Sequence, residues 1–305
     1  MKRTIAFLKI YLRWFIFGIA ILFILNTFYN NWSTVLTVTL DHQSCYLLIL
    51  AFLVTFFSHI WSALVWVKIL NILKQPMTKK WGLKVYLTTN ISKYIPGNIG
   101  HFYGRIIAIS QQGISLKIAS FSVLLEPLFM AISALIITLL SNPFGVNRNP
   151  YSSWFSVIQI IIMLIGLLVI HPFFVNKIFF YLKEIKQKNV HSEIHLRQYP
   201  KTILLGEMGF ILLRGLGFIL TWTAFIPLSM FQIPLLLNAF SFAWLLGLLI
   251  PGAPGGMGVF EAAIIFLLKT ENFPIQIVFC AITIFRLISI LAEVTGAGLV
   301  LLTKE

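Results

Sequence analysis

Five charged residues that stand within strongly apolar stretches are the chain's first candidates for chemistry: Arg105, Glu126, Glu261, Arg286 and Glu293. Ionisable side chains inside a membrane are expensive and usually have a function. A guanidinium group binds phosphate oxygens through parallel hydrogen bonds, so Arg105 and Arg286 are suited to hold a phosphate. The residue types therefore predict a path for an anionic group.

Two glycine- and proline-rich breaks, at residues 95–100 and 250–258, accompany these charges in the two halves of the chain. A broken helix survives in lipid only where protein or a water-filled cavity satisfies its backbone, and paired breaks indicate a transport site near the bilayer midplane. A helix that begins after such a break offers free N–H groups to an anion. The motif residues are Pro96, Gly97, Gly100, Gly104, Pro251, Gly252, Gly255, Gly256 and Gly258.

A lipid phosphate headgroup fits this chemistry, because it is an anion whose tails can remain in hydrocarbon. We expect Glu126 and Glu261 to receive a cationic part of the headgroup or a coupling proton.

Glu207 and Arg214 lie seven residues apart, as do Arg286 and Glu293, so each pair shares a helical face but is separated by about two turns. Each of these four charges should therefore face a partner on another helix.

The composition places this path in a membrane protein. The chain is 59% hydrophobic and 10% charged, with a mean hydropathy of +0.92, whereas soluble domains carry roughly 25% charged residues. The net charge of +14 comes from basic residues at the ends of apolar runs, which argues against nucleic acid as a partner. The two cysteines define no disulfide or metal framework, and we expect no metal and no cofactor.

The apolar runs predict an all-α integral membrane protein, a single polytopic domain over residues 1–305 with about seven spanning helices. The predicted spans are 11–28, 46–67, 118–140, 154–172, 202–228, 234–250 and 275–302. Two shorter apolar pieces, 83–95 and 259–268, adjoin the breaks and should form re-entrant elements. The similarity of the two breaks suggests an internal repeat.

Basic residues alternate between the predicted loops and give an orientation. Lysines and arginines precede the first span, follow the second, and crowd the loop 176–201, while the intervening loops are nearly free of them. The positive-inside rule then puts the N-terminus in the cytoplasm, in a multi-pass plasma (inner) membrane protein. The side on which the C-terminus lies stays open.

Residues 95–105, 122–126 and 251–261, followed by Arg286, resemble in that order the lysylphosphatidylglycerol synthase transmembrane region, a flippase-like family. The resemblance implies an inner-membrane domain with re-entrant helices that moves or handles lipids between leaflets. In the aminoacyl-lipid synthases this region is followed by a cytosolic aminoacyltransferase domain. These 305 residues hold no such domain, so we do not expect the chain to be an enzyme by itself.

Our interpretation of the sequence is a translocator of a phospholipid or lipid-linked anion, with membrane lipids as partners. An alternative is an accessory subunit that presents lipid to a separately encoded glycosyl- or aminoacyltransferase. A third class is a transporter of small solutes or ions. Headgroup, energy coupling and oligomeric state do not follow from the sequence.

Overall fold

The computed structural model describes residues 41–94, 98–141, 150–177, 199–250, 254–268 and 273–302, and every regular element in these ranges is a helix. This confirms the all-α class. The predicted first span, most of the basic loop 176–201 and the motif residues Pro96, Gly97, Pro251 and Gly252 lie outside the described residues.

Five described helices are long and apolar enough to cross a membrane, and each occupies one of the predicted spans. They are α3 (His42–Ile72), α6 (Leu116–Leu140), α9 (Lys201–Thr223), α10 (Gln232–Leu249) and α12 (Ile275–Leu302). Helix α7 (Pro150–Val169) stands where the span 154–172 was predicted, and its apolar stretch Ser156–Val169 presents exposed isoleucines and leucines. The molecule is therefore built as an integral, multi-pass membrane protein.

Polar side chains define where several helices begin. The carboxylate of Asp41 accepts a 2.7 Å hydrogen bond from the backbone N–H of Ser44 and caps α3. That bond lowers the pKa of the Asp41 carboxyl. The hydroxyl groups of Thr78 and Ser115 cap α4 (Lys79–Asn90) and α6 in the same way. Each cap satisfies a backbone donor that the first helical turn leaves free.

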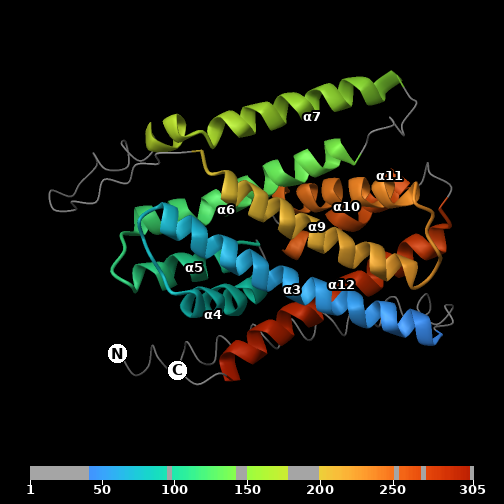
Figure 1. Cartoon of the computed structure of the whole chain (residues 1–305), viewed down its shortest axis with the longest axis horizontal. Helices are drawn as coiled ribbons and strands as arrows, with labels where there is room; N and C mark the ends of the chain where they lie inside the picture. Colours follow the sequence, from blue (N-terminus) through green and yellow to red (C-terminus); the bar gives the residue numbers. More distant parts are fainter. Residues whose placement is uncertain are drawn as a thin grey trace.

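The first predicted re-entrant element is a short helical hairpin. Helix α4 (Lys79–Asn90) and the 3₁₀ turn η1 (Ile91–Tyr94) lead to the first break, and α5 (Gly100–Ser110) returns along α4. Figure 1 shows α4 and α5 at the end of the molecule where α3 finishes. The long helix α6 follows directly and packs on α5.

The second break forms a similar hairpin at the opposite end (Figure 1). Helix α10 leads to the break and the turn η2 (Pro254–Gly256), and α11 (Val259–Leu268) returns along α10. The long helix α12 follows. The two turns η1 and η2 contact each other, and a Cβ atom added to Gly255 would lie 2.8 Å from the Tyr94 ring. The hairpin tips therefore meet inside the bundle.

The scaffold around the hairpins rests on close packing of α3 against α9. Gly206 of α9 faces Val65, and its carbonyl accepts a 2.7 Å hydrogen bond from the indole N–H of Trp61. Small residues let membrane helices approach closely enough for such contacts. Farther along α9, Phe218 joins a cluster of aromatic rings from α10, α11 and α12 that underlies the second hairpin.

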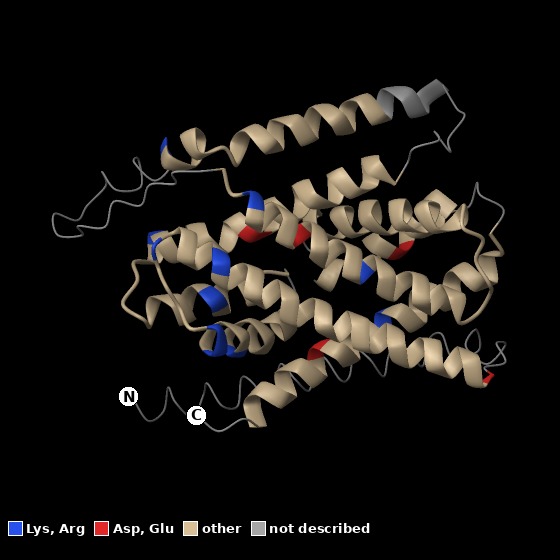
Figure 2. Cartoon of the chain, viewed as in Figure 1, with Lys and Arg blue, Asp and Glu red and all other residues tan. Residues whose placement is uncertain are grey.

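Basic residues gather at one end of the molecule. Figure 2 shows lysines where α4 and α9 begin, away from the interior charges. By their positions in the helices, the described lysines other than Lys93 are Lys68 and Lys74 near the end of α3, Lys79, Lys80 and Lys84 in α4, Lys117 at the start of α6, Lys177 after α7 and Lys201 at the start of α9. Helix α12 finishes at the same end, since Val300 packs against the same apolar cluster as Met77 and Trp81 (Figure 1). The described end of α12 thus lies near the lysines at the start of α4.

We predict that Gly206→Ala destabilises the fold by about 1–3 kcal/mol, because its new methyl group would lie 2.7 and 3.2 Å from the two γ carbons of buried Val65. Rotation of Val65 cannot relieve both contacts. Gly298→Ala in α12 is the matched control, since nothing lies within 4 Å of its added Cβ. Thermal unfolding in detergent measures both, and equal melting temperatures would contradict the packing argument.

Candidate functional site

The first charge pair joins the first hairpin to the helix that follows it. Arg105 on α5 donates from Nη1 to Oε2 of Glu126 on α6, and both side chains are only 2% exposed. The Tyr86 hydroxyl donates to Glu126 Oε1 over 2.6 Å and in turn lies 2.6 Å from the Ser62 hydroxyl. The guanidinium carbon of Arg105 stands 3.7 Å from the Tyr86 ring centroid, a cation–π contact.

The second pair joins the second hairpin to its following helix. Arg286 on α12 donates from Nε to Glu261 Oε1 on α11 over 2.5 Å. Its two terminal nitrogens donate over 3.0 Å to the backbone carbonyl oxygens of Gly255 and Gly256. The guanidinium group therefore satisfies the broken backbone and the carboxylate at once.

The two pairs have the same arrangement with the charges exchanged. In each half, a charged residue on the short helix after the break pairs with an opposite charge on the next long helix, Arg105 with Glu126 and Glu261 with Arg286. The predicted roles of Glu126 and Glu261 toward a cationic part of the headgroup or a coupling proton stay predictions. Each carboxylate is already held by an arginine of the protein.

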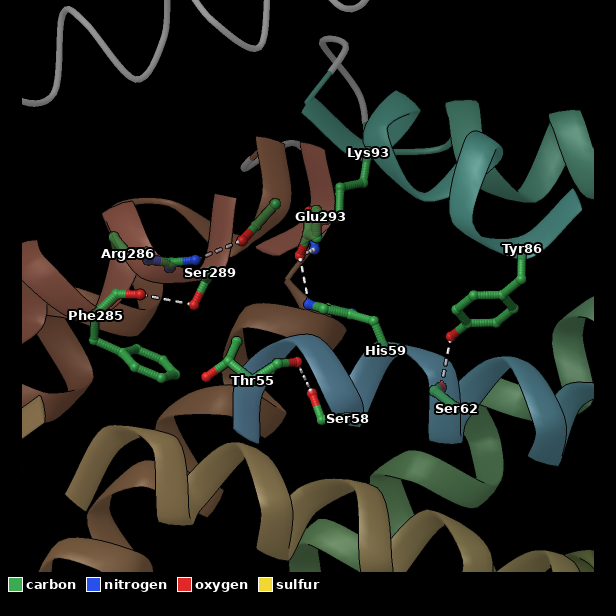
Figure 3. A network of polar contacts seen from close by, with 11 residues as sticks. Thr55, Ser58, His59, Ser62, Tyr86, Lys93, Phe285, Arg286, Ser289 and Glu293 are labelled. Atoms are coloured by element: carbon green, nitrogen blue, oxygen red, sulfur yellow. Dashed lines mark hydrogen bonds and ion pairs between the residues drawn. The ribbon is translucent and has the colours of Figure 1, made fainter. Parts of the chain in front are cut away.

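Glu293 on α12, the fifth predicted site residue, forms a third cluster (Figure 3). Its Oε1 lies 2.5 Å from Lys93 Nζ of η1 and 3.3 Å from His59 Nε2 of α3. Sequence reasoning missed Lys93 and His59. Lys93 stands two residues before the first break and could have been found from that position, whereas His59 has no neighbouring signal in the sequence.

A cavity of about 130 Å³ lies where these three clusters converge. Its described lining includes four cations, Lys93, Arg105, Arg214 and Arg286, together with Glu126. The remaining wall contains His59, Tyr86, Asn90, Asn98, His101, Gly247, Gly255, Gly256 and apolar side chains. Such a lining can bind an anion. Among the described residues, no group of three His, Cys, Asp or Glu side chains could hold a metal ion.

Arg214 and Glu207 on α9 differ from the paired charges. Both are buried, at 6% and 0% exposure. Within the described part of the chain, Nε and Nη1 of Arg214 and both carboxylate oxygens of Glu207 have no hydrogen-bond partner. The expectation that each of these two charges pairs with another helix is therefore not met, although the Arg214 guanidinium carbon lies 5.0 Å from the Phe285 ring centroid.

The described motif glycines let neighbouring parts of the backbone pack closely, and they do not themselves form a binding site. A Cβ on Gly100 would lie 2.5 Å from the Ser92 carbonyl oxygen, and one on Gly104 would lie 2.9 Å from Thr89, so α5 can pack tightly on the preceding turn. Gly255, Gly256 and Gly258 have φ angles of +58°, +72° and +78°. This backbone conformation aims the two carbonyl groups at Arg286.

The described helices thus form an all-α, multi-pass membrane protein in which two short helical hairpins border a buried cavity lined by charged residues. The chain belongs to the lysylphosphatidylglycerol synthase transmembrane region family, whose sequence profile matches residues 12–295. This family membership, with the five spanning helices, indicates a multi-pass membrane protein of a lipid-modifying or flippase-like kind. A comparison with curated proteins gives no match.

We predict that Glu126→Leu alone destabilises the protein by about 3–5 kcal/mol, because Arg105 would remain as a buried charge without its partner. The double variant Arg105→Met/Glu126→Leu should recover most of this loss. Unfolding in detergent measures the single and double variants together. A double variant no more stable than Glu126→Leu would show that the two residues do not act as a pair.

We predict that Gly256→Asn lowers stability more than Gly258→Asn. Both positions have positive φ, which asparagine tolerates better than other non-glycine residues. A Cβ on Gly256 would lie 3.1 Å from the Gly247 backbone, whereas nothing lies within 4 Å of one on Gly258. We expect a difference of about 1–3 kcal/mol from the steric overlap, measured by thermal unfolding. A larger loss for the Gly258 variant would contradict the described packing.

Proposed function

We propose that the protein translocates a lipid with an anionic headgroup between the leaflets of the plasma membrane. The observation that carries this proposal is the cavity between the two hairpin tips, with four cations in its wall. We further propose membrane lipids as the partners, and a cytoplasmic N-terminus on the side of the basic loops.

The position of the cavity supports translocation. Arg214 is the fourteenth of the 23 residues of α9, about 20 Å from one end of that helix and about 14 Å from the other. A headgroup bound there would be roughly midway between the leaflets. Hairpins that enter from opposite ends can each cover one approach to such a site, as alternating access requires.

The described lining supports binding rather than bond cleavage. It contains no serine, cysteine or threonine that could serve as a nucleophile. Its carboxylate, Glu126, accepts bonds from both Arg105 and Tyr86. We therefore propose a non-enzymatic role in which the protein surrounds the headgroup and releases it unchanged.

The proposal predicts that reconstituted protein exchanges fluorescent anionic phospholipid between the leaflets of proteoliposomes. Arg105→Ala and Glu261→Ala should each abolish exchange, because each leaves an unpaired charge beside the cavity and frees one hairpin from its following helix. The measurement is the fraction of label that becomes accessible to a membrane-impermeant quencher.

Lys201→Gln is the matched control, since it removes an exposed positive charge at the start of α9, far from the cavity. It should exchange lipid at the unmodified rate. Melting temperatures of all variants must show folded protein. Absence of exchange with every lipid from folded protein would overturn the proposal and favour the accessory role.

A further inference from the structure

Arg214 is the cation in the cavity wall that the protein leaves available. Its side chain is nine-tenths buried, and two of its three nitrogen atoms have no hydrogen-bond partner among the described residues. The other cations of the wall are engaged, Arg105 by Glu126, Arg286 by Glu261, and Lys93 by Glu293. Arg214 therefore has donors to offer to a ligand.

The charges around the cavity leave an excess of one positive charge. Four cations stand in its described wall, and three carboxylates pair with three of them, Glu126 from within the wall and Glu261 and Glu293 from outside it, which gives 4 − 3 = 1. Glu207 lies two turns from Arg214, about 10 Å along α9, and its carboxylate oxygens accept no hydrogen bond from the described residues. No described carboxylate of the wall is free to receive an ammonium group.

An unpaired guanidinium group in this position lowers stability, because burial removes water without supplying acceptors. Such a charge is retained inside a membrane protein for a ligand or an ion path.

The volume of the cavity also limits the size of the group that can bind. A water molecule needs about 10–15 Å³ by the same measure, so the cavity admits a group the size of roughly ten waters. A phosphate group with its nearest substituent fits, but lipid tails do not.

We propose that Arg214 anchors the phosphate group of the ligand and that the cavity selects ligands of net negative charge over zwitterionic ones. This inference rests on the proposed function and narrows it. A phosphodiester without a cationic substituent neutralises the excess charge of the wall. The ammonium group of a zwitterionic headgroup would instead lie among four cations, and Glu126, the carboxylate of the described wall, has both of its oxygen atoms engaged by Tyr86 and Arg105.

Binding of short-chain phosphatidylglycerol and short-chain phosphatidylcholine with identical tails tests the selection, and inorganic phosphate alone tests the anion without lipid. The readout is ligand-dependent thermal stabilisation in a non-ionic detergent. We expect phosphatidylglycerol to bind at least about tenfold more tightly than phosphatidylcholine, as one charged hydrogen-bonded contact would produce. Arg214→Gln should abolish that preference, and Arg214→Lys should retain part of it.

Lys201→Gln, which removes a positive charge from the exposed start of the same helix, should leave the preference unchanged. Glu207→Gln should leave it unchanged or increase it. Arg214→Gln should melt no lower than the unmodified protein without ligand, since it removes an uncompensated buried charge. If Arg214→Gln does not fold, the relative binding of phosphatidylglycerol and phosphatidylcholine to the unmodified protein still tests the selection by charge.

Equal binding of the two lipids, or a preference that survives Arg214→Gln, would overturn the inference. Binding of inorganic phosphate that requires Arg214, without binding of either lipid, would support the anion site while contradicting lipid translocation. Selective phosphatidylglycerol binding without leaflet exchange would support the site and contradict the transport step. The two proposals can therefore fail separately.

Discussion

The guanidinium group of Arg286 is the contact on which the second half of the structure depends. It holds a carboxylate and two backbone carbonyl groups at the point where the helix is broken. Without water, unsatisfied carbonyl groups at that depth would each cost several kcal/mol. Gly255, Gly256 and Arg286 all line the cavity, so this one side chain stabilises the part of the wall that the second hairpin contributes.

Elements whose signal is local were predictable from the sequence. The five described spans follow from runs of apolar residues, and the two hairpins follow from the proline and glycine breaks. The choice of partners was not predictable in the same way. Arg105 was assigned to a ligand and pairs with Glu126, because the packing of α5 on α6 determines which charges meet. His59 and Lys93 come together with Glu293 only through tertiary contacts.

The role of Arg214 illustrates the same limit. Its spacing from Glu207 suggested two structural charges with partners elsewhere, and nothing in the sequence distinguishes a paired arginine from an unpaired one. The structure makes the distinction: Glu293, the acid on the neighbouring helix α12, forms its ion pair with Lys93 of the first hairpin. The interior charges discussed from the sequence are three arginines and four glutamates, and this count does not show which of them pair.

The pairing of each hairpin with its own counter-charge also determines how the protein can respond to voltage. Each of the two ion pairs is neutral as a unit, so the membrane potential does almost no work on a pair that moves intact. If the first hairpin moves without α6, it must break the buried Arg105–Glu126 pair, at a cost of about 3–5 kcal/mol. For a cargo of one negative charge, the electrical work of about 2.3 kcal/mol per 100 mV falls on the cargo itself. The membrane potential would then set the direction of net movement without opening either hairpin.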